Sequence, residues 1–457
     1  STNIQKNQIT EGIIWRQLLL FFFPILLGTF FQQLYNTIDS VIVGQFVGKE
    51  ALAAVGGSSA QIVAFVVGFF TGLSSGASVT IAQFFGAKDS RSANKGLHTA
   101  YAIAAFGGLI LTVSGIILTP FLLEMMNTPA DIVADSAVYL RIYFAGIIFV
   151  LIYNMGSAIL RATGDSKRPL YYLIVCCIIN IVLDVLFVIV FHMGVMGVAV
   201  ATLIAQAVSA VLVTLKLMRS EGILKLSVKQ IRFHGSILKM QLKLGLPTGF
   251  EAILFSITNI AIQSAVNTFG TDTTAAWSAY GKLDAIFWMV STAFGIAITT
   301  FVGQNYGAGK MDRVRKSTRV CLLMDFIVSA VLVVFLIAAR FLLFRLFTND
   351  SHVIEIGCDM LVLITPWYIV YVFIEVIAGA LRGVGNVVVP VAITLLGVCV
   401  LRIAWLAAML KISPTISAII LSYPVTWVIT ALAFIIYYIY ITHKTIAGSS
   451  KKHVPKL

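Results

Sequence analysis

The sequence predicts an all-α polytopic membrane protein in which twelve transmembrane helices form two pseudo-symmetric six-helix bundles around a central cavity. Three observations predict this fold: twelve long apolar runs, an alternation of basic loops, and an internal repeat. Of the 457 residues, 59% are hydrophobic and only 11% are charged, against about 25% in a soluble domain. This composition excludes a soluble protein, and we attribute the net charge of +13 to loops beside a membrane rather than to nucleic-acid binding.

Apolar runs mark the expected spans, since a membrane-crossing helix needs about 20 mostly apolar residues. They lie at 14–43, 51–79, 97–120, 132–158, 169–191, 194–217, 241–269, 276–302, 318–344, 354–380, 387–410 and 415–441. The first run is too long for a cleavable signal peptide and lacks its cleavage pattern. The five cysteines show neither a disulfide framework nor metal-ligand spacing.

Basic residues alternate between the two sides of these spans. If the N-terminus is cytoplasmic, 25 of the 32 Lys and Arg residues fall in cytoplasmic segments, as the positive-inside rule requires. We therefore expect a multi-pass protein of the cell inner (plasma) membrane with both termini in the cytoplasm. The long basic connection predicts an N-terminal lobe at 1–217, a cytoplasmic linker at 218–240, a C-terminal lobe at 241–442 and a cytoplasmic tail at 443–457.

The chain repeats itself. The Leu-Arg turns at Arg161 and Arg382 lie 221 residues apart, and so do the Gln-x-x-Gly-Ala motifs at Gln83 and Gln304. A shift of six spans preserves direction, so the halves should be related by an axis along the membrane normal. Paired bundles of this kind usually enclose a central substrate site.

A polar stripe interrupts the first span. Gln32, Tyr35, Asn36 and Asp39 fall at i, i+3, i+4 and i+7, which is one face of a helix. A carboxylate at bilayer depth costs about 2.5–3.5 kcal/mol even on the mildest scale. Asp39 therefore needs a partner, water or a proton.

Two later spans supply possible partners for Asp39. Asn180 and Asp184 are one helical turn apart on the fifth span, and Thr202 lies on the sixth. Two carboxyl groups in a poorly hydrated pocket cannot both stay ionised unaided, and their oxygens suit a hard cation. We interpret the four as an ion- or proton-coupling site with no metal beyond Na⁺, and Pro24 on the same first span as a conformational hinge. The alternative is a purely structural network of hydrogen bonds between helices.

At this point the chain resembles the multidrug and toxic compound extrusion (MATE) family. The motifs that carry the resemblance are Pro24 with Tyr35-Asn36 and Asp39, Ala51 to Gly56, Gln83 with Gly86-Ala87, the turns at Arg161 and Arg382, and Asn180 with Asp184. The resemblance implies two six-helix lobes, a central cavity, and efflux of lipophilic, often cationic, compounds in exchange for Na⁺ or H⁺. In the branch that this sequence is similar to, the N-terminal lobe holds the cation or proton at the positions of Asp39, Asn180, Asp184 and Thr202.

Other polar residues are candidates for lining a substrate cavity: Gln32, Tyr35, Asn36, Asn154 and Glu251. For the first four, packing between helices is an equally good reading. Glu251 is the best candidate for attracting a cationic drug, and an ion pair within the protein is the alternative for it. The expected partners are small lipophilic or cationic molecules and the lipid bilayer, with no nucleic acid and no cofactor beyond the coupling ion. We expect the chain to act as a monomer.

The second half does not repeat the polar site. The positions equivalent to Asp39, Asn180 and Asp184 hold Ile262, Leu401 and Trp405. This half has its own charges within the spans, at Glu251, Lys282, Asp284, Asp325, Glu375 and Arg402. We expect Lys282 or Arg402 to neutralise Glu251 or Glu375.

Three other functions remain open. A flippase for a lipid-linked precursor, from the same superfamily, would need a more cationic cavity than the acids of the first half provide. A membrane-embedded enzyme would need a His/Asp or Ser/His constellation, whereas all six histidines lie in or near loops and span ends. A channel is disfavoured by the two-lobe repeat. No phosphate-binding GK[ST] motif is present, so transport driven by ATP is not expected.

Overall fold

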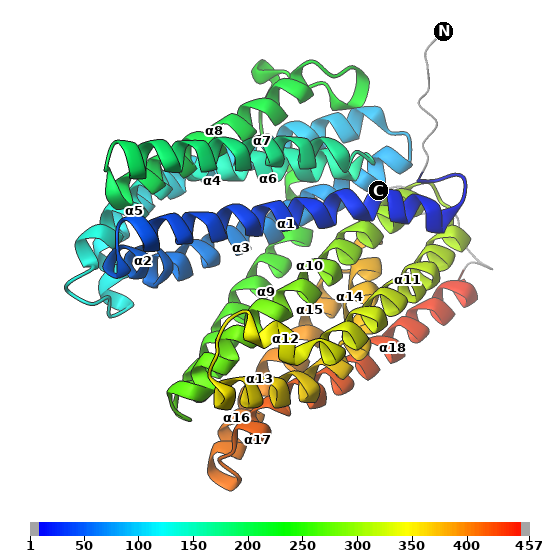
Figure 1. The fold of residues 1–457 in the computed structure, drawn as a ribbon. Coiled ribbons are helices and arrows are strands. Elements are labelled where there is room, and N and C mark those ends of the chain that lie inside the picture. Colours follow the sequence, from blue (N-terminus) through cyan, green and yellow to red (C-terminus); the bar gives the residue numbers. More distant parts are fainter. Residues whose placement is uncertain (1–8, 449–457) are drawn as a thin grey trace. The chain divides into compact units, whose positions relative to one another are not determined.

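The structure is a computed structural model that describes residues 9–448. Within this range all regular secondary structure is helical, from α1 to α18 (Figure 1). Eleven helical stretches of these residues are long and apolar enough to cross a membrane, and one bent pair completes twelve. Each overlaps one predicted run, so the all-α polytopic fold is confirmed. Most of the predicted tail at 443–457 lies outside the described residues.

Contacts between helices divide the described chain into two units, which we call the N-terminal unit (20–249) and the C-terminal unit (250–448 with 9–19). The N-terminal unit contains most of α1 (Ile14–Phe46), then α2 (Lys49–Gly56), α3 (Ser58–Gly86), α4 (Ser90–Met125), α5 (Val133–Ala145), α6 (Ile147–Ala162), α7 (Lys167–Asp184), the π-helical turn η1 (Val185–Val190), α8 (Gly194–Met218), the 3-10 turns η2 (Gly222–Leu224) and η3 (Val228–Gln230), and the first part of α9 (Gly235–Asn267). The C-terminal unit contains the rest of α9, α10 (Thr271–Gly307), α11 (Met311–Ala338), α12 (Arg340–Arg345), α13 (Ser351–Ile364), the 3-10 turn η4 (Thr365–Trp367), α14 (Tyr368–Gly383), α15 (Val388–Thr394), the π-helical turn η5 (Leu395–Val400), α16 (Leu401–Ile412), α17 (Ile416–Ile420) and α18 (Ser422–Gly448).

The boundary between the units does not fall in the predicted linker. We expected lobes at 1–217 and 241–442 joined by 218–240, whereas the described chain changes unit after Leu19 in α1 and after Gly249 in α9. The linker and the start of α9 belong to the N-terminal unit because contacts with α3 and α4 fasten them there.

Two pairs of glycines bring α3 and α9 into backbone contact. Gly72 faces Gly249, and Gly76 faces Gly245 one turn further along. A methyl group added at Gly72 would lie 2.6 Å from the Cα of Gly249, and one at Gly76 would lie 2.5 Å from the backbone nitrogen of Gly245. Glycines four residues apart on both helices are a common basis of close packing in membranes. This glycine seam holds the start of α9 against the N-terminal unit.

Polar side chains on the first turns of α4 hold the segment between α8 and α9. Asn94 Nδ2 donates to the carbonyl oxygens of Ile223 and Lys225 at 2.9 and 3.0 Å. His98 Nε2 accepts the backbone N–H of Ser227 at 3.0 Å, and its Nδ1 lies 2.8 Å from the carbonyl oxygen of Asn94. One ring nitrogen accepts while the other faces a carbonyl, so this arrangement requires a neutral His98 with its proton on Nδ1.

Replacing His98 with Ala is expected to loosen this segment. The variant leaves the part-buried N–H of Ser227 without an acceptor, which costs about 1–3 kcal/mol, so we expect local opening to become about 10-fold more frequent. Limited digestion with trypsin, which cleaves after the basic residues of the segment, measures the opening. His352→Ala, at an exposed position, is the control, and equal digestion of the two variants would contradict the role of His98.

The residues just before α1 are held through their backbone by the C-terminal unit. The Arg313 guanidinium donates to three carbonyl oxygens of residues 9–12 at 2.9–3.1 Å. Lys310 Nζ donates to a fourth, that of Thr10, at 2.8 Å. Because a guanidinium carries five donors in a fixed fork, one side chain can bind several carbonyls. The start of α1 is thereby fixed in one unit while most of the helix belongs to the other.

The predicted span at 132–158 is the bent pair, in which α5 and α6 meet at 47°. Gly146 lies at the break and donates its N–H to the carbonyl oxygens of Ile142 and Tyr143 at 3.2 and 3.1 Å. A methyl group at Gly146 would lie 2.8 Å from Cγ of Leu203. Only glycine therefore allows α8 to pack so close to the bend.

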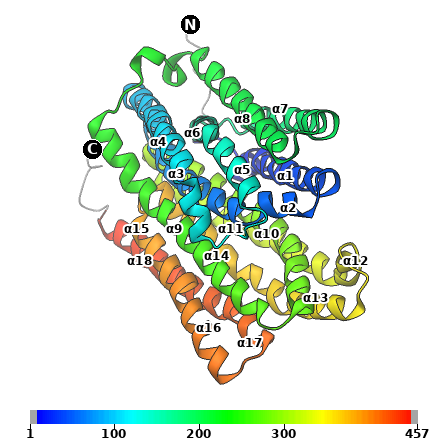
Figure 2. The same ribbon diagram turned by 90° about the vertical axis from the view of Figure 1, so that its left-hand side faces the viewer.

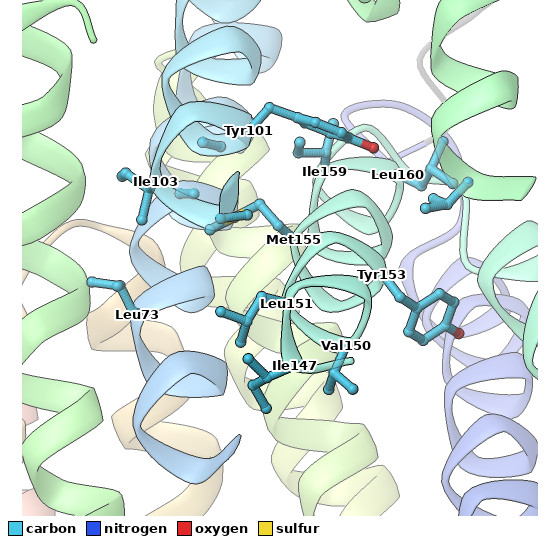
Figure 3. Close-up of a cluster of buried hydrophobic side chains, with 14 of the residues drawn as sticks. Leu73, Tyr101, Ile103, Ile147, Val150, Leu151, Tyr153, Met155, Ile159 and Leu160 are labelled. Carbon is cyan, nitrogen blue, oxygen red and sulfur yellow. The ribbon is translucent and has the colours of Figure 1, made fainter. Parts of the chain in front are cut away.

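The hydrophobic core of the N-terminal unit surrounds α6. In Figure 3, Leu151 and Met155 point toward α3, on the side where Leu73 lies, while Tyr153 points the other way. The Tyr153 hydroxyl donates to the carbonyl oxygen of Pro169 in α7 at 2.8 Å. Packing on two sides of α6 thus fixes the position of α7, which carries two of the candidate site residues.

Candidate functional site

The N-terminal unit brings together the four predicted site residues from α1, α7 and α8, which lie side by side (Figures 1 and 2). Thr202 Oγ1 of α8 donates to Oδ2 of Asp39 in α1 at 3.3 Å. Asn180 Nδ2 of α7 donates to Oγ1 of the same threonine at 3.3 Å. Asp184 lies one turn after Asn180, and its carboxyl group interacts electrostatically with that of Asp39. The helical spacing seen in the sequence thus produces a single cluster of oxygens.

The cluster is buried from solvent, and several of its oxygens have no hydrogen-bond donor among the described residues. Asp39 and Thr202 are each 7% exposed, Asn180 is 1% exposed and Asp184 is fully buried. Oδ1 of Asp39, Oδ1 of Asn180 and both carboxyl oxygens of Asp184 receive no hydrogen bond from the described part of the chain. Buried polar atoms without partners cost free energy, and an unpaired buried carboxylate costs the most. A bound cation or proton would satisfy these oxygens.

Apolar residues close one end of this oxygen cluster. Ile42 lies three residues after Asp39 on α1, and Val198 lies four residues before Thr202 on α8; both belong to one buried apolar group with Val188. Val188 lies in the π-helical turn η1 that begins directly after Asp184. Such turns are rare and frequently occur at functional sites. The site is therefore polar inside and sealed by hydrocarbon at this end.

A second polar contact joins α1 and α8 one turn away from the first. Gln206 Nε2 donates to the hydroxyl of Tyr35 at 3.1 Å, and both side chains are buried. The sequence interpretation missed Gln206, although it lies one turn after Thr202. Tyr35, which we predicted to line a substrate cavity, is instead enclosed within the unit. This placement favours helix packing as its role.

The remaining predicted residues of the N-terminal unit are not part of the cluster. Gln32 and Asn36 are exposed, although they share the predicted stripe with Tyr35, and Asn154 is half-buried. Their contact with substrate stays a prediction. Pro24 lies inside α1, which is helical from Ile14 to Phe46, and its action as a hinge also stays a prediction.

The equivalent place in the C-terminal unit is apolar. Ile262 is buried in a group with Val266, Leu406 and Ile419. No oxygen cluster of the kind formed by Asp39 and Asp184 can exist there, as the sequence comparison of the two halves predicted.

Arg382, rather than Lys282 or Arg402, is the cation beside the two partly buried glutamates, Glu251 and Glu375. Arg382 Nη2 lies 3.2 Å from Oε1 of Glu375, and its charge also acts on Glu251, which is partly buried nearby. Lys282 is exposed. The expected pairing was wrong because sequence spacing does not show which long side chain reaches an acid seven residues away on the same helix.

Asp284 forms a contrasting acidic centre in the C-terminal unit. Its carboxylate accepts hydrogen bonds from the Tyr280 hydroxyl at 3.2 Å, from the Trp288 indole N–H at 2.7 Å and from the Tyr368 hydroxyl. Arg402 is within electrostatic reach, and its guanidinium lies 4.0 Å from the centre of the Tyr423 ring. The carboxylate of Asp284 is thus satisfied by protein donors, unlike that of Asp184.

No group of three or more His, Cys, Asp or Glu residues in the described part of the chain has the arrangement of a metal site. All five cysteines are buried and none is in a disulfide. The oxygens of Asp39, Asn180, Asp184 and Thr202 are therefore the best candidates for holding an ion.

Known proteins resemble this chain in both sequence and fold. The model of the MatE family matches residues 24–186 and again residues 247–406. The chain belongs to the MatE family. The two matches begin at residues 24 and 247, which is close to the offset of 221 residues between the repeated motifs. The predicted resemblance is confirmed. Members of this family are transporters, so the chain is a membrane transporter and not an enzyme.

Individual relatives are similar over most of their length. The probable multidrug resistance protein YoeA of Bacillus subtilis (strain 168) is 30% identical over 84% of each chain. The probable multidrug resistance protein NorM of Thermotoga maritima is 27% identical over 89% of this chain and 88% of its own. A crystal structure of MATE in the bent conformation matches with a TM-score of 0.91 at 20% identity, over 98% of this chain and 99% of that one. This last likeness supports the fold.

Proposed function

We propose that this chain is a secondary active multidrug efflux antiporter, which exports lipophilic or cationic compounds in exchange for H⁺ or Na⁺ by alternating access. Its relatives are described as probable multidrug resistance proteins, and its family consists of transporters. It acts as a monomer in the plasma membrane, with both termini in the cytoplasm, and uses no cofactor beyond the coupling ion.

One observation supports the ion coupling: four buried oxygens of Asp39, Asn180 and Asp184 receive no hydrogen bond from residues 9–448. Two neighbouring carboxyl groups with no ion pair to a described basic residue can share a proton, or can bind Na⁺ with the oxygens of the amide and of Thr202. Occupancy changes the charge of the cluster by one unit. Such a change in a dry site alters the packing of the helices that carry it, which is how an ion can bias two conformations.

The coupling depends on α1. This helix carries Asp39 toward one end and Pro24 about a third of the way along, and the anchored residues 9–12 come before its start. Pro24 has no backbone N–H and so weakens the helix at that position. An ion that binds at Asp39 can thus change the bend of a helix whose start is held by Arg313.

The test is transport of a fluorescent lipophilic cation in proteoliposomes, with Na⁺ and pH gradients imposed separately. We expect one of the two gradients to drive transport against the concentration gradient of the cation, and its collapse to stop transport. Movement of the cation that is indifferent to both gradients would contradict an antiporter. The same result would favour a channel, which equilibrates its substrate without a coupling ion.

A further inference from the structure

The segment between α8 and α9 combines exposed cations with exposed apolar side chains. Between Lys216 and Lys243 the sequence holds seven Lys and Arg residues and one acid, Glu221. Five exposed residues of this segment are either cationic or apolar, and we call them the basic ledge: Lys225, Val228, Lys229, Arg232 and Phe233. None of the three cationic side chains of the ledge forms an ion pair with another described residue.

The basic ledge is held in place rather than free. Asn94 and His98 of α4 bind its backbone at Lys225 and Ser227, and the hydroxyl of Thr99 accepts the N–H of His234 at 3.3 Å. Three side chains of one helix thus fix the segment from its first turn to its last. Because its backbone is already fixed, the segment loses little backbone conformational entropy when its cations bind an anionic group.

One aromatic contact places the ledge at the edge of the hydrocarbon layer. The rings of Phe233 and Phe106 meet edge to face, with centroids 5.8 Å apart. Phe106 begins an exposed apolar stripe on α4 that continues through Ile110, Val113 and Ile117. Such a stripe on a membrane-spanning helix faces lipid tails. Phe233 therefore lies where the tails end, and the cations beside it lie at the depth of the headgroups.

The positive charge of this region also acts on a neighbouring histidine. Burial lowers the pKa of His234 from its ordinary value, and the nearby charges of Arg232 and Lys95 lower it further. His234 is thus kept neutral near pH 7, and it adds no charge of its own. The segment nevertheless keeps an excess of positive charge, because Glu221 is the one acid among its seven Lys and Arg residues.

We propose that the basic ledge is a binding surface for the headgroup of an anionic phospholipid, with the phosphate at Lys225, Lys229 and Arg232 and the acyl chains along Phe233 and the stripe of α4. The sign of the charge selects anionic over zwitterionic lipid. The exposed aromatic and aliphatic residues select a lipid over a soluble phosphate. Basic clusters beside a membrane span are typical sites for anionic lipids.

Native mass spectrometry of the detergent-solubilised full chain, titrated with phosphatidylglycerol or phosphatidylcholine, tests this surface. Each Lys or Arg near a membrane surface strengthens anionic-lipid binding about 5-fold. We expect the triple variant Lys225→Gln/Lys229→Gln/Arg232→Gln to bind phosphatidylglycerol at least 10-fold more weakly, and phosphatidylcholine as before. In the wild-type protein, 0.5 M ammonium acetate should weaken phosphatidylglycerol binding in the same way, which keeps the test independent of the folding of the variant.

A matched control removes three exposed charges elsewhere: Lys49→Gln/Arg345→Gln/Lys411→Gln. It should keep the phosphatidylglycerol affinity of the wild type. Equal losses in the two triple variants would overturn the ledge as a site, because the effect would then follow net charge alone. Equal binding of the two lipids, or displacement of phosphatidylglycerol by equimolar glycerol phosphate, would overturn the lipid as its occupant.

Discussion

Replacing Asp39 with Asn is expected to abolish gradient-driven transport while the protein folds as before. Asn has nearly the same size, and its Oδ1 can still accept the hydrogen bond from Thr202, but it has no charge and takes up no proton. The cluster then keeps one carboxyl group, that of Asp184. We expect uptake of a fluorescent cation by proteoliposomes to fall to about 1% of the wild-type rate or less, because the ion no longer distinguishes two conformations.

Two further variants distinguish a loss of ion coupling from a loss of the folded structure. Asp184→Asn should give the same loss, and the double variant should lose no more than either single one, because residues that act as a unit are not additive. Asp131→Asn removes an exposed acid from the same unit and should transport normally. If Asp39→Asn still shows gradient-driven transport, the cluster is not part of the mechanism. If transport is lost while the melting temperature of this variant is unchanged, misfolding is not the cause.

Apolar length predicted twelve spans, and helical periodicity together with the family resemblance predicted the meeting of Asp39, Asn180, Asp184 and Thr202. The reason is physical: a carboxylate within an apolar helix must face other polar groups, and few were available in the first half of the chain. The same argument failed for Gln32 and Asn36, which lie on the stripe but are exposed. The four residues of the stripe cover a wide arc of the helix surface. Only the part of that arc that carries Tyr35 and Asp39 contacts α8.

The sequence alone did not predict which side chains contact the acids of the C-terminal unit. The partner of Glu375 depends on how far the side chain of Arg382 extends, and the centre around Asp284 depends on three aromatic donors from two helices. The boundary between the units was misplaced for a similar reason. Charge marks a cytoplasmic segment, but it does not show that Asn94 and His98 bind this segment to α4.

Replacing Gly76 with Ala is expected to have the largest effect on stability. Its methyl group would lie 2.5 Å from the backbone nitrogen and 2.7 Å from the Cα of Gly245, where no side chain can rotate away. The two helices must separate along the seam, and the neighbouring pair of Gly72 and Gly249 then loses contact too. Overpacking of this kind costs about 1–3 kcal/mol and sometimes more, so we expect the detergent-solubilised protein to melt about 5–10 °C lower.

Gly281→Ala is the matched control, since Gly281 lies inside α10 with open space around the added methyl group. It should melt at the wild-type temperature or slightly higher, because alanine favours a helix by about 1 kcal/mol over glycine. Gly245→Ala should lower the melting temperature as much as Gly76→Ala. The double variant should lower it little further, because one methyl group already forces the backbones apart. If Gly76→Ala melts at the same temperature as the wild type, the glycine seam does not hold the start of α9. The contacts with α4 alone would then explain why the start of α9 belongs to the N-terminal unit.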